Sequence, residues 1–112
     1  MDILIQADGL TVTDGLRSAV ETKIGRVEQY APRAVRARVF LRKISAHPSP
    51  RQYAVRVLCE LPGKDVSCEQ YGEDILSAVD VVAEKIERLL RKRKTNRLAR
   101  RERGRRAGKP KN

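Results

Sequence analysis

The sequence predicts an α+β fold: a two-layer sandwich in which two helices cover one face of a four-stranded sheet, in the order β-α-β-β-β-α. Two segments carry apolar residues at helical spacing, and four short segments alternate apolar with polar residues. A chain of 112 residues suffices for one modest core but not for two. The strand–helix–strand unit at the start predicts that the first two strands run parallel if they are neighbours.

Residues 1–7 alternate weakly, with Ile3 and Ile5 on one side, which predicts the first strand. The first helix is expected to follow, with Thr13 as its N-cap and Pro32 as the residue that ends it. Its apolar residues recur at steps of three or four and form one stripe, which consists of Leu16, Val20, Ile24, Val27 and Ala31.

Residues 34–44, 52–61 and 66–71 predict the remaining strands. In the connecting "PGKD", Gly63 at the first central position suits a type II′ hairpin turn. That turn would place Cys59 and Cys68 opposite each other on the buried face. A disulfide between them is geometrically conceivable, but in a cytosolic protein two small core residues are the favoured interpretation.

The second helix is expected over residues 72–94, with acidic residues at its start and cations at its end, as the helix dipole favours. Its stripe consists of Ile75, Val79, Val82, Ile86 and either Leu89 or Leu90. Beyond it, the chain is either a solvated helical extension as far as Gly104 or disordered. We expect a folded domain over residues 1–94 and a basic, flexible tail over residues 95–112.

Charge is strongly segregated along the chain. Residues 1–84 hold eleven Lys or Arg against twelve Asp or Glu, whereas residues 85–112 hold fourteen against two. Residues 29–59 contain seven cations and no acid. Such segregation costs self-repulsion and therefore favours a large polyanion, above all nucleic acid, over a merely solubilising surface.

The sequence offers little for catalysis, metal binding or membrane insertion. His47 is the only histidine and lies directly before Pro48 in a loop with two prolines, and no glycine-rich phosphate loop is present. Two cysteines and one histidine lack the spacing of zinc sites. No targeting segment or apolar run of membrane length occurs in the sequence. We expect a cytoplasmic protein that is not an enzyme and has no cofactor, small-molecule substrate or membrane partner.

Cations flank the apolar stripes of both predicted helices. Lys23 and Arg26 lie on one shoulder of the first helix. On the second helix, one shoulder carries Lys85, Arg88 and Lys92. If the two basic shoulders face each other, they line a positive groove that tracks phosphates and continues into Arg91, Arg93 and Lys94. The alternative is ordinary solvated helix charge with Glu–Lys pairing along each helix.

The few aromatic residues make base stacking a poor mechanism, so recognition of structured RNA through shape and phosphates is favoured. The element order also differs from that of an RRM domain. A double-stranded-RNA-binding domain ends similarly but places lysines at the start of its last helix, where Glu73 and Asp74 stand here.

The segments "VTDGLRSAVETKIGRVEQY" and "EDILSAVDVVAEKIERLLRKRK" resemble the ribosome hibernation promoting factor family, also described as ribosome-associated inhibitors or sigma-54 modulation proteins, in its short form. The resemblance covers roughly residues 1–95. It implies a bacterial translation silencer, associated with stress, whose domain over residues 1–94 binds the small ribosomal subunit near the decoding region and occludes tRNA and mRNA sites. The contacts to 16S rRNA that it implies are Lys23, Arg26, Lys85, Arg88, Arg91 and Lys92.

Two other functions stay open from the sequence. One is a general RNA-binding module or RNA chaperone that acts through the Arg-rich tail. The other is a protein-interaction domain that presents Arg36, Arg38 and Arg42, on the open face of the sheet, to an acidic partner.

Overall fold

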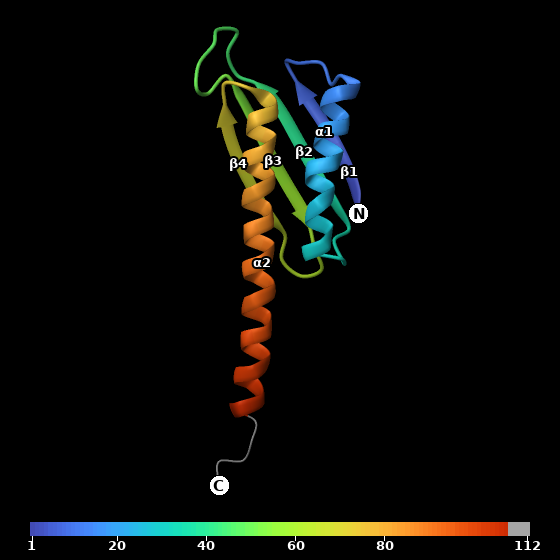
Figure 1. The fold of residues 1–112 in the computed structure, drawn as a ribbon, viewed down its shortest axis with the longest axis vertical. Helices are drawn as coiled ribbons and strands as arrows, with labels where there is room; N and C mark the ends of the chain where they lie inside the picture. Colours follow the sequence, from blue (N-terminus) through green and yellow to red (C-terminus); the bar gives the residue numbers. More distant parts are fainter. Residues whose placement is uncertain (108–112) are drawn as a thin grey trace.

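The fold predicted from the sequence is confirmed by a computed structural model, which describes the backbone of residues 1–107 and side chains as far as Arg93. A four-stranded sheet in the order β1-β2-β3-β4 forms one layer, and two helices lie side by side on one of its faces (Figure 1). The bounds are β1 Asp2–Asp8, α1 Asp14–Gly25, η1 Arg26–Tyr30, β2 Arg36–Lys43, β3 Tyr53–Glu60, β4 Val66–Gly72 and α2 Ile75–Ala107.

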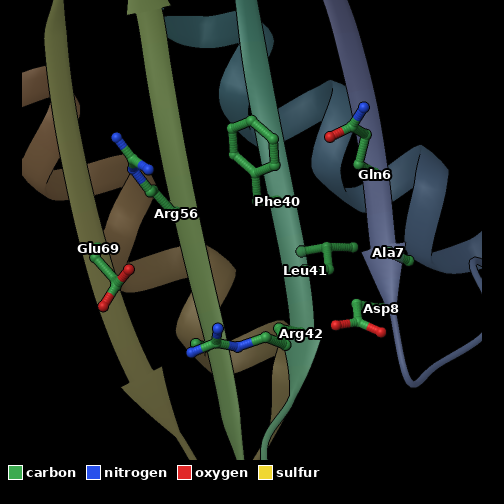
Figure 2. Close-up of a pocket in the computed structure, with 9 residues that line it drawn as sticks. Gln6, Ala7, Asp8, Phe40, Leu41, Arg42, Arg56 and Glu69 are labelled. Carbon is green, nitrogen blue, oxygen red and sulfur yellow. The ribbon is translucent and has the colours of Figure 1, made fainter.

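The sheet is mixed. β1 and β2 pair in parallel, as the crossover through α1 requires, with Ile3 opposite Ala37. The pairs β2–β3 and β3–β4 are antiparallel hairpins. α1 lies over β1 and β2, whereas α2 lies over β3 and β4 (Figure 1). No helix of residues 1–107 covers the opposite face of the sheet (Figure 2).

The core lies between the helices and the sheet, because both predicted apolar stripes point to the same layer. From α1 and η1 it takes Leu16, Val20, Ile24 and Val27; from the sheet, Ala37, Val39, Leu41, Val55 and Val57; and from α2, Ala78, Val79, Val82, Ile86 and Leu90. Burial of an aliphatic side chain contributes roughly 1.5–3 kcal/mol, so these residues supply most of the stability of the fold.

The first helical segment ends earlier than expected. The Thr13 hydroxyl oxygen accepts a hydrogen bond from the Leu16 amide at 3.2 Å, so the predicted N-cap is confirmed. The α-helix stops at Gly25 and continues as a 3₁₀ turn to Tyr30. Glycine is a weak helix former, and 3₁₀ turns are common at helix ends. Val27 stays buried through this change.

The predicted hairpin turn is wrong by one position. Cys59 pairs with Val66 and Val57 pairs with Cys68, so the two cysteines are not opposite each other, and both are free. Gly63 has a φ of 88°, and it follows Pro62, whose ring presets φ near −65°. These are the values that the two central positions of a type II turn need, so Pro62 and Gly63 form the centre of the loop.

Asp74 caps the start of α2. Its carboxylate accepts hydrogen bonds from the Ser77 amide at 3.2 Å and from the Ser77 hydroxyl at 2.8 Å, and these bonds hold the pKa of Asp74 below its usual range. Replacing Asp74 with alanine is expected to cost about 1 kcal/mol of unfolding free energy near neutral pH. The Asp74→Asn variant, which keeps an accepting oxygen, is expected to lose less.

Denaturant unfolding at several pH values checks this prediction. Because folding lowers the pKa of Asp74, the wild-type advantage over Asp74→Ala is fully present above the unfolded-state pKa of about 3.9. It is lost as the pH falls through the lower, folded-state pKa. A difference between the two proteins that is equally large at pH 2 would rule out the carboxylate as its source.

Candidate nucleic-acid interface

The cleft between α1 and α2 has one basic and one acidic wall. Lys23 and Arg26 line it from α1 and η1, and Asp80, Glu84 and Glu87 line it from α2, above a floor of Val27 and Ala83. The Lys23 ammonium forms an ion pair with the Asp80 carboxylate. The cleft encloses about 250 Å³. With two cations facing three carboxylates, the cleft is not a continuous positive groove.

The predicted basic groove between the two helices is therefore wrong. Lys85 lies on the other flank of α2, where its ammonium donates a hydrogen bond to the side-chain oxygen of Gln70 on β4. A helix turns 100° per residue, so the position after buried Ile86 and the position before it fall on opposite flanks. Glu87 falls on the flank toward α1, and Lys85 falls on the flank toward β4.

A cationic ridge nevertheless follows the flank and outer surface of α2. It consists of Lys85, Arg88 and Lys92, spaced by three and four residues. Arg88 and Lys92 are exposed, and neither has a carboxylate within ion-pair distance among the side chains that the structure describes. The ridge can bind phosphate without first breaking an internal ion pair.

Arg91 and Arg93 hold α2 against the domain. The Arg91 guanidinium stacks on the Tyr30 ring at 4.6 Å, donates a hydrogen bond to the Tyr30 hydroxyl at 2.6 Å and pairs with Glu87 at 3.3 Å. The hydrogen bond to Tyr30 raises the pKa of Arg91. Arg93 donates to the carbonyl oxygens of Lys64 and Pro62 in the β3–β4 loop.

These two arginines thus have partners within the protein, which the sequence did not indicate. Tyr30 was also missed as a partner, because nothing in its local sequence places it beside a residue 61 positions later. The side chain of Lys94 lies outside the part of the chain whose side chains the structure describes.

Beyond these anchors, α2 projects from the domain as far as Ala107 (Figure 1). Of the alternatives left open, a helical extension is thus the one observed over residues 95–107, and residues 108–112 lie outside the described residues. At 1.5 Å per residue, the helix carries its basic sequence about 25 Å past Leu90. The ridge and this extension form one continuous basic element.

The described residues provide no reactive centre of the usual kinds. Burial raises the pKa of the Cys59 thiol, which keeps it protonated and unreactive near neutral pH. His47 lies in an exposed loop, where its amide donates to the Ser45 hydroxyl oxygen. No cluster of three metal-ligating side chains occurs among the described residues. Within the same part of the chain, no helix combines the length and apolar character that crossing a bilayer would need.

Comparison with known proteins agrees with this architecture. Residues 3–98 match the family described as sigma 54 modulation protein / S30EA ribosomal protein. The ribosome hibernation promotion factor of Deinococcus radiodurans is 33% identical over 94 residues, which are 84% of this chain and 49% of that relative. The factor of the same name from Staphylococcus aureus is 34% identical over 99 residues, or 81% of this chain and 47% of that relative. The chain spans about half the length of these curated relatives.

Two solved structures share the fold. The N-terminal domain of Thermus thermophilus Protein Y superposes with a TM-score of 0.70 at 24% identity, covering 82% of this chain and 98% of that domain. A ribosomal subunit interface protein from Coxiella burnetii superposes with a TM-score of 0.74 at 22% identity, covering 85% and 99% of the two chains. The resemblance predicted from the sequence is thereby confirmed. The chain belongs to the sigma 54 modulation protein / S30EA ribosomal protein family.

Proposed function

We propose that the chain is a cytoplasmic ribosome hibernation factor of a bacterium that silences translation by occupying the small ribosomal subunit. Its partner is 16S rRNA near the decoding region, where the bound domain occludes the sites of tRNA and mRNA. Membership of the family confirms the prediction that the protein is not an enzyme. Inhibition of this kind needs only occupancy, because a bound domain excludes other ligands sterically.

The cationic ridge of α2 is the observation that carries this proposal. Arg88 and Lys92 are exposed, and their cations continue into the basic extension of the same helix. A helix presents these charges at regular intervals along its axis, so that they can contact successive phosphates along an RNA backbone. Arg91 and Arg93 contribute by fixing the direction in which α2 leaves the domain.

Lys23 and Arg26 make a second, separate contribution in this proposal. Arg26 is exposed at the rim of the cleft, whereas Lys23 is held by Asp80. An RNA that reached Lys23 would have to compete with this ion pair. We therefore expect these two residues to contribute less binding free energy than the ridge of α2.

Sedimentation of a lysate with tagged protein through a sucrose gradient tests the proposal. The protein is expected to travel with small subunits and with ribosomes that contain them. If it neutralises 6–10 phosphates, its affinity should fall by about 10³–10⁵-fold between about 50 and 200 mM salt. Sedimentation with isolated large subunits only would overturn the proposal.

Residues 85–112 hold fourteen cations and only two acids, and this charge also supports a second candidate function, that of a general RNA-binding module. The two functions differ in what competes for the protein. A hibernation factor should be displaced from ribosomes far less by bulk RNA than by purified small subunits. A general RNA-binding module should be displaced equally by both at the same phosphate concentration.

A further inference from the structure

The open face of the sheet holds a depression of about 650 Å³, on the side away from both helices (Figure 2). This volume lies within the range of about 300–1,000 Å³ that small-ligand sites occupy, unlike the cleft between α1 and α2. Its side chains come from all four strands, with Gln6, Asp8, Phe40, Arg42, Arg56 and Glu69 as the functional groups.

Phe40 stands at the centre of this depression on the inner strand β2. It pairs in register with Gln6 on β1 and with Arg56 on β3. Figure 2, which looks onto the open face, shows the ring nearly face-on, so its π surface is turned outward. The Arg56 guanidinium lies 6.0 Å from the centroid of the ring. An outward ring beside a guanidinium is a platform on which a flat, anionic ligand can stack.

Arg42 provides a second cation at the same site. It reaches across β3 (Figure 2), where its partner in register is the small residue Ala54. Ala54 is only 4% exposed although it lies on the open face, in keeping with the long side chain that crosses it. Among the described residues, neither Arg42 nor Arg56 forms an ion pair, whereas Arg36 and Arg38 both pair with Glu60.

Acceptors complete the lining. In the strand register, Asp8 lies opposite Arg42 and Glu69 lies opposite Arg56. Neither carboxylate forms an ion pair with these arginines among the described side chains. A carboxylate accepts hydrogen bonds from exocyclic amino groups such as that of cytosine. Donors, acceptors and a stacking ring therefore meet in one depression.

We propose that this depression binds a nucleotide of single-stranded RNA. The base stacks on Phe40. Arg42 and Arg56 bind the phosphates of the RNA next to that base, and Asp8 or Glu69 accepts a hydrogen bond from the amino group of the base. The site should therefore prefer cytosine over uracil, which has no amino group. An acidic peptide would use only the two arginines and would leave the Phe40 ring without a stacking partner.

The test uses the full chain and fluorescence-labelled nonamers of cytidine or uridine, with binding measured by anisotropy. Salt of about 200 mM weakens the phosphate contacts of the basic helix. Phe40→Leu keeps an apolar side chain but removes the ring. It should lower the affinity for oligocytidine by about 5–150-fold, the range that one stacked base contributes. The preference for cytidine over uridine should disappear with it.

A matched variant on the helix side, Arg88→Gln with Lys92→Gln, separates this site from the proposed ribosome-binding surface. It should weaken both oligonucleotides alike and keep the preference for cytidine. Unchanged affinities in Phe40→Leu would overturn the inference. So would a nuclease-resistant complex with an acidic protein that depends on Arg42 and Arg56 but not on the ring. None of these results depends on whether the protein sediments with ribosomes.

Discussion

Replacing Leu90 with alanine is expected to lower the free energy of unfolding by about 2–5 kcal/mol, a large part of the 5–15 kcal/mol typical of a whole domain. Leu90 is 2% exposed and belongs to the central hydrophobic cluster. Among the residues of α2 whose side chains the structure describes, it is the last buried one, so the cavity left by the substitution would also loosen the base of the projecting helix.

Leu89 provides the matched control, because it is the same residue type on the same helix, one position earlier. It is 41% exposed, so Leu89→Ala should cost less than about 1 kcal/mol. Urea unfolding followed by circular dichroism compares the two variants directly. Equal costs would contradict the placement of α2, since the sequence allowed either leucine to end the apolar stripe.

The fold was predictable because it depends on local patterns. The alternation around Val39 and Val57 and the helical stripe through Val20 and Ile24 each indicate an element and its buried face. Two helices with one apolar stripe each can bury both stripes against one face of the same sheet. Most of the residues that form the core followed from these patterns without knowledge of long-range contacts. Ala78, which is buried, belongs to neither predicted stripe, and the predicted stripe residues Ala31 and Ile75 are only partly buried.

The positions of the charged side chains were harder to predict. A stripe shows which side of α2 faces the sheet, but not which of its two flanks faces α1. The flank that faces α1 depends on the order of the strands beneath the helices. Because of this order, Asp80 forms an ion pair with Lys23, whereas Lys85 donates a hydrogen bond to Gln70. The hairpin register depended similarly on the torsion angles of one dipeptide, Pro62-Gly63.

Polar contacts between residues far apart in the chain could not be predicted from the sequence. Arg91 and Arg93 read as members of one basic run, yet each is bound to a distant part of the chain, at Tyr30 and at the β3–β4 loop. The expected flexibility of residues 95–112 and the role of each cation in RNA binding stay predictions. Charge segregation indicates the class of partner but not which cations meet it.

Reversing the charge of the ridge should have the largest effect on ribosome binding. Arg88→Glu combined with Lys92→Glu removes two exposed cations that have no ion pair among the described side chains, so the fold should be preserved. A hydrogen bond to a charged group contributes about 1.5–3 kcal/mol, and two of them correspond to about 10²–10⁴-fold in affinity. Repulsion between the new carboxylates and phosphate adds to this loss.

The control for this double variant must change the net charge of the protein by the same amount at positions outside the ridge. Arg33 and Lys43 are exposed, lie outside both helices and form no ion pair with a described residue. Arg33→Glu with Lys43→Glu therefore reproduces the loss of total charge without altering the ridge. Thermal unfolding of both double variants establishes that each is folded before it is compared.

Co-sedimentation of these two double variants with purified small subunits, at one fixed salt concentration, measures where the protein binds. Loss of binding in Arg88→Glu/Lys92→Glu, with near wild-type binding in Arg33→Glu/Lys43→Glu, is the predicted result. If the two folded variants bind small subunits equally well, the ridge of α2 is not the binding surface, and attraction by total charge accounts for the association.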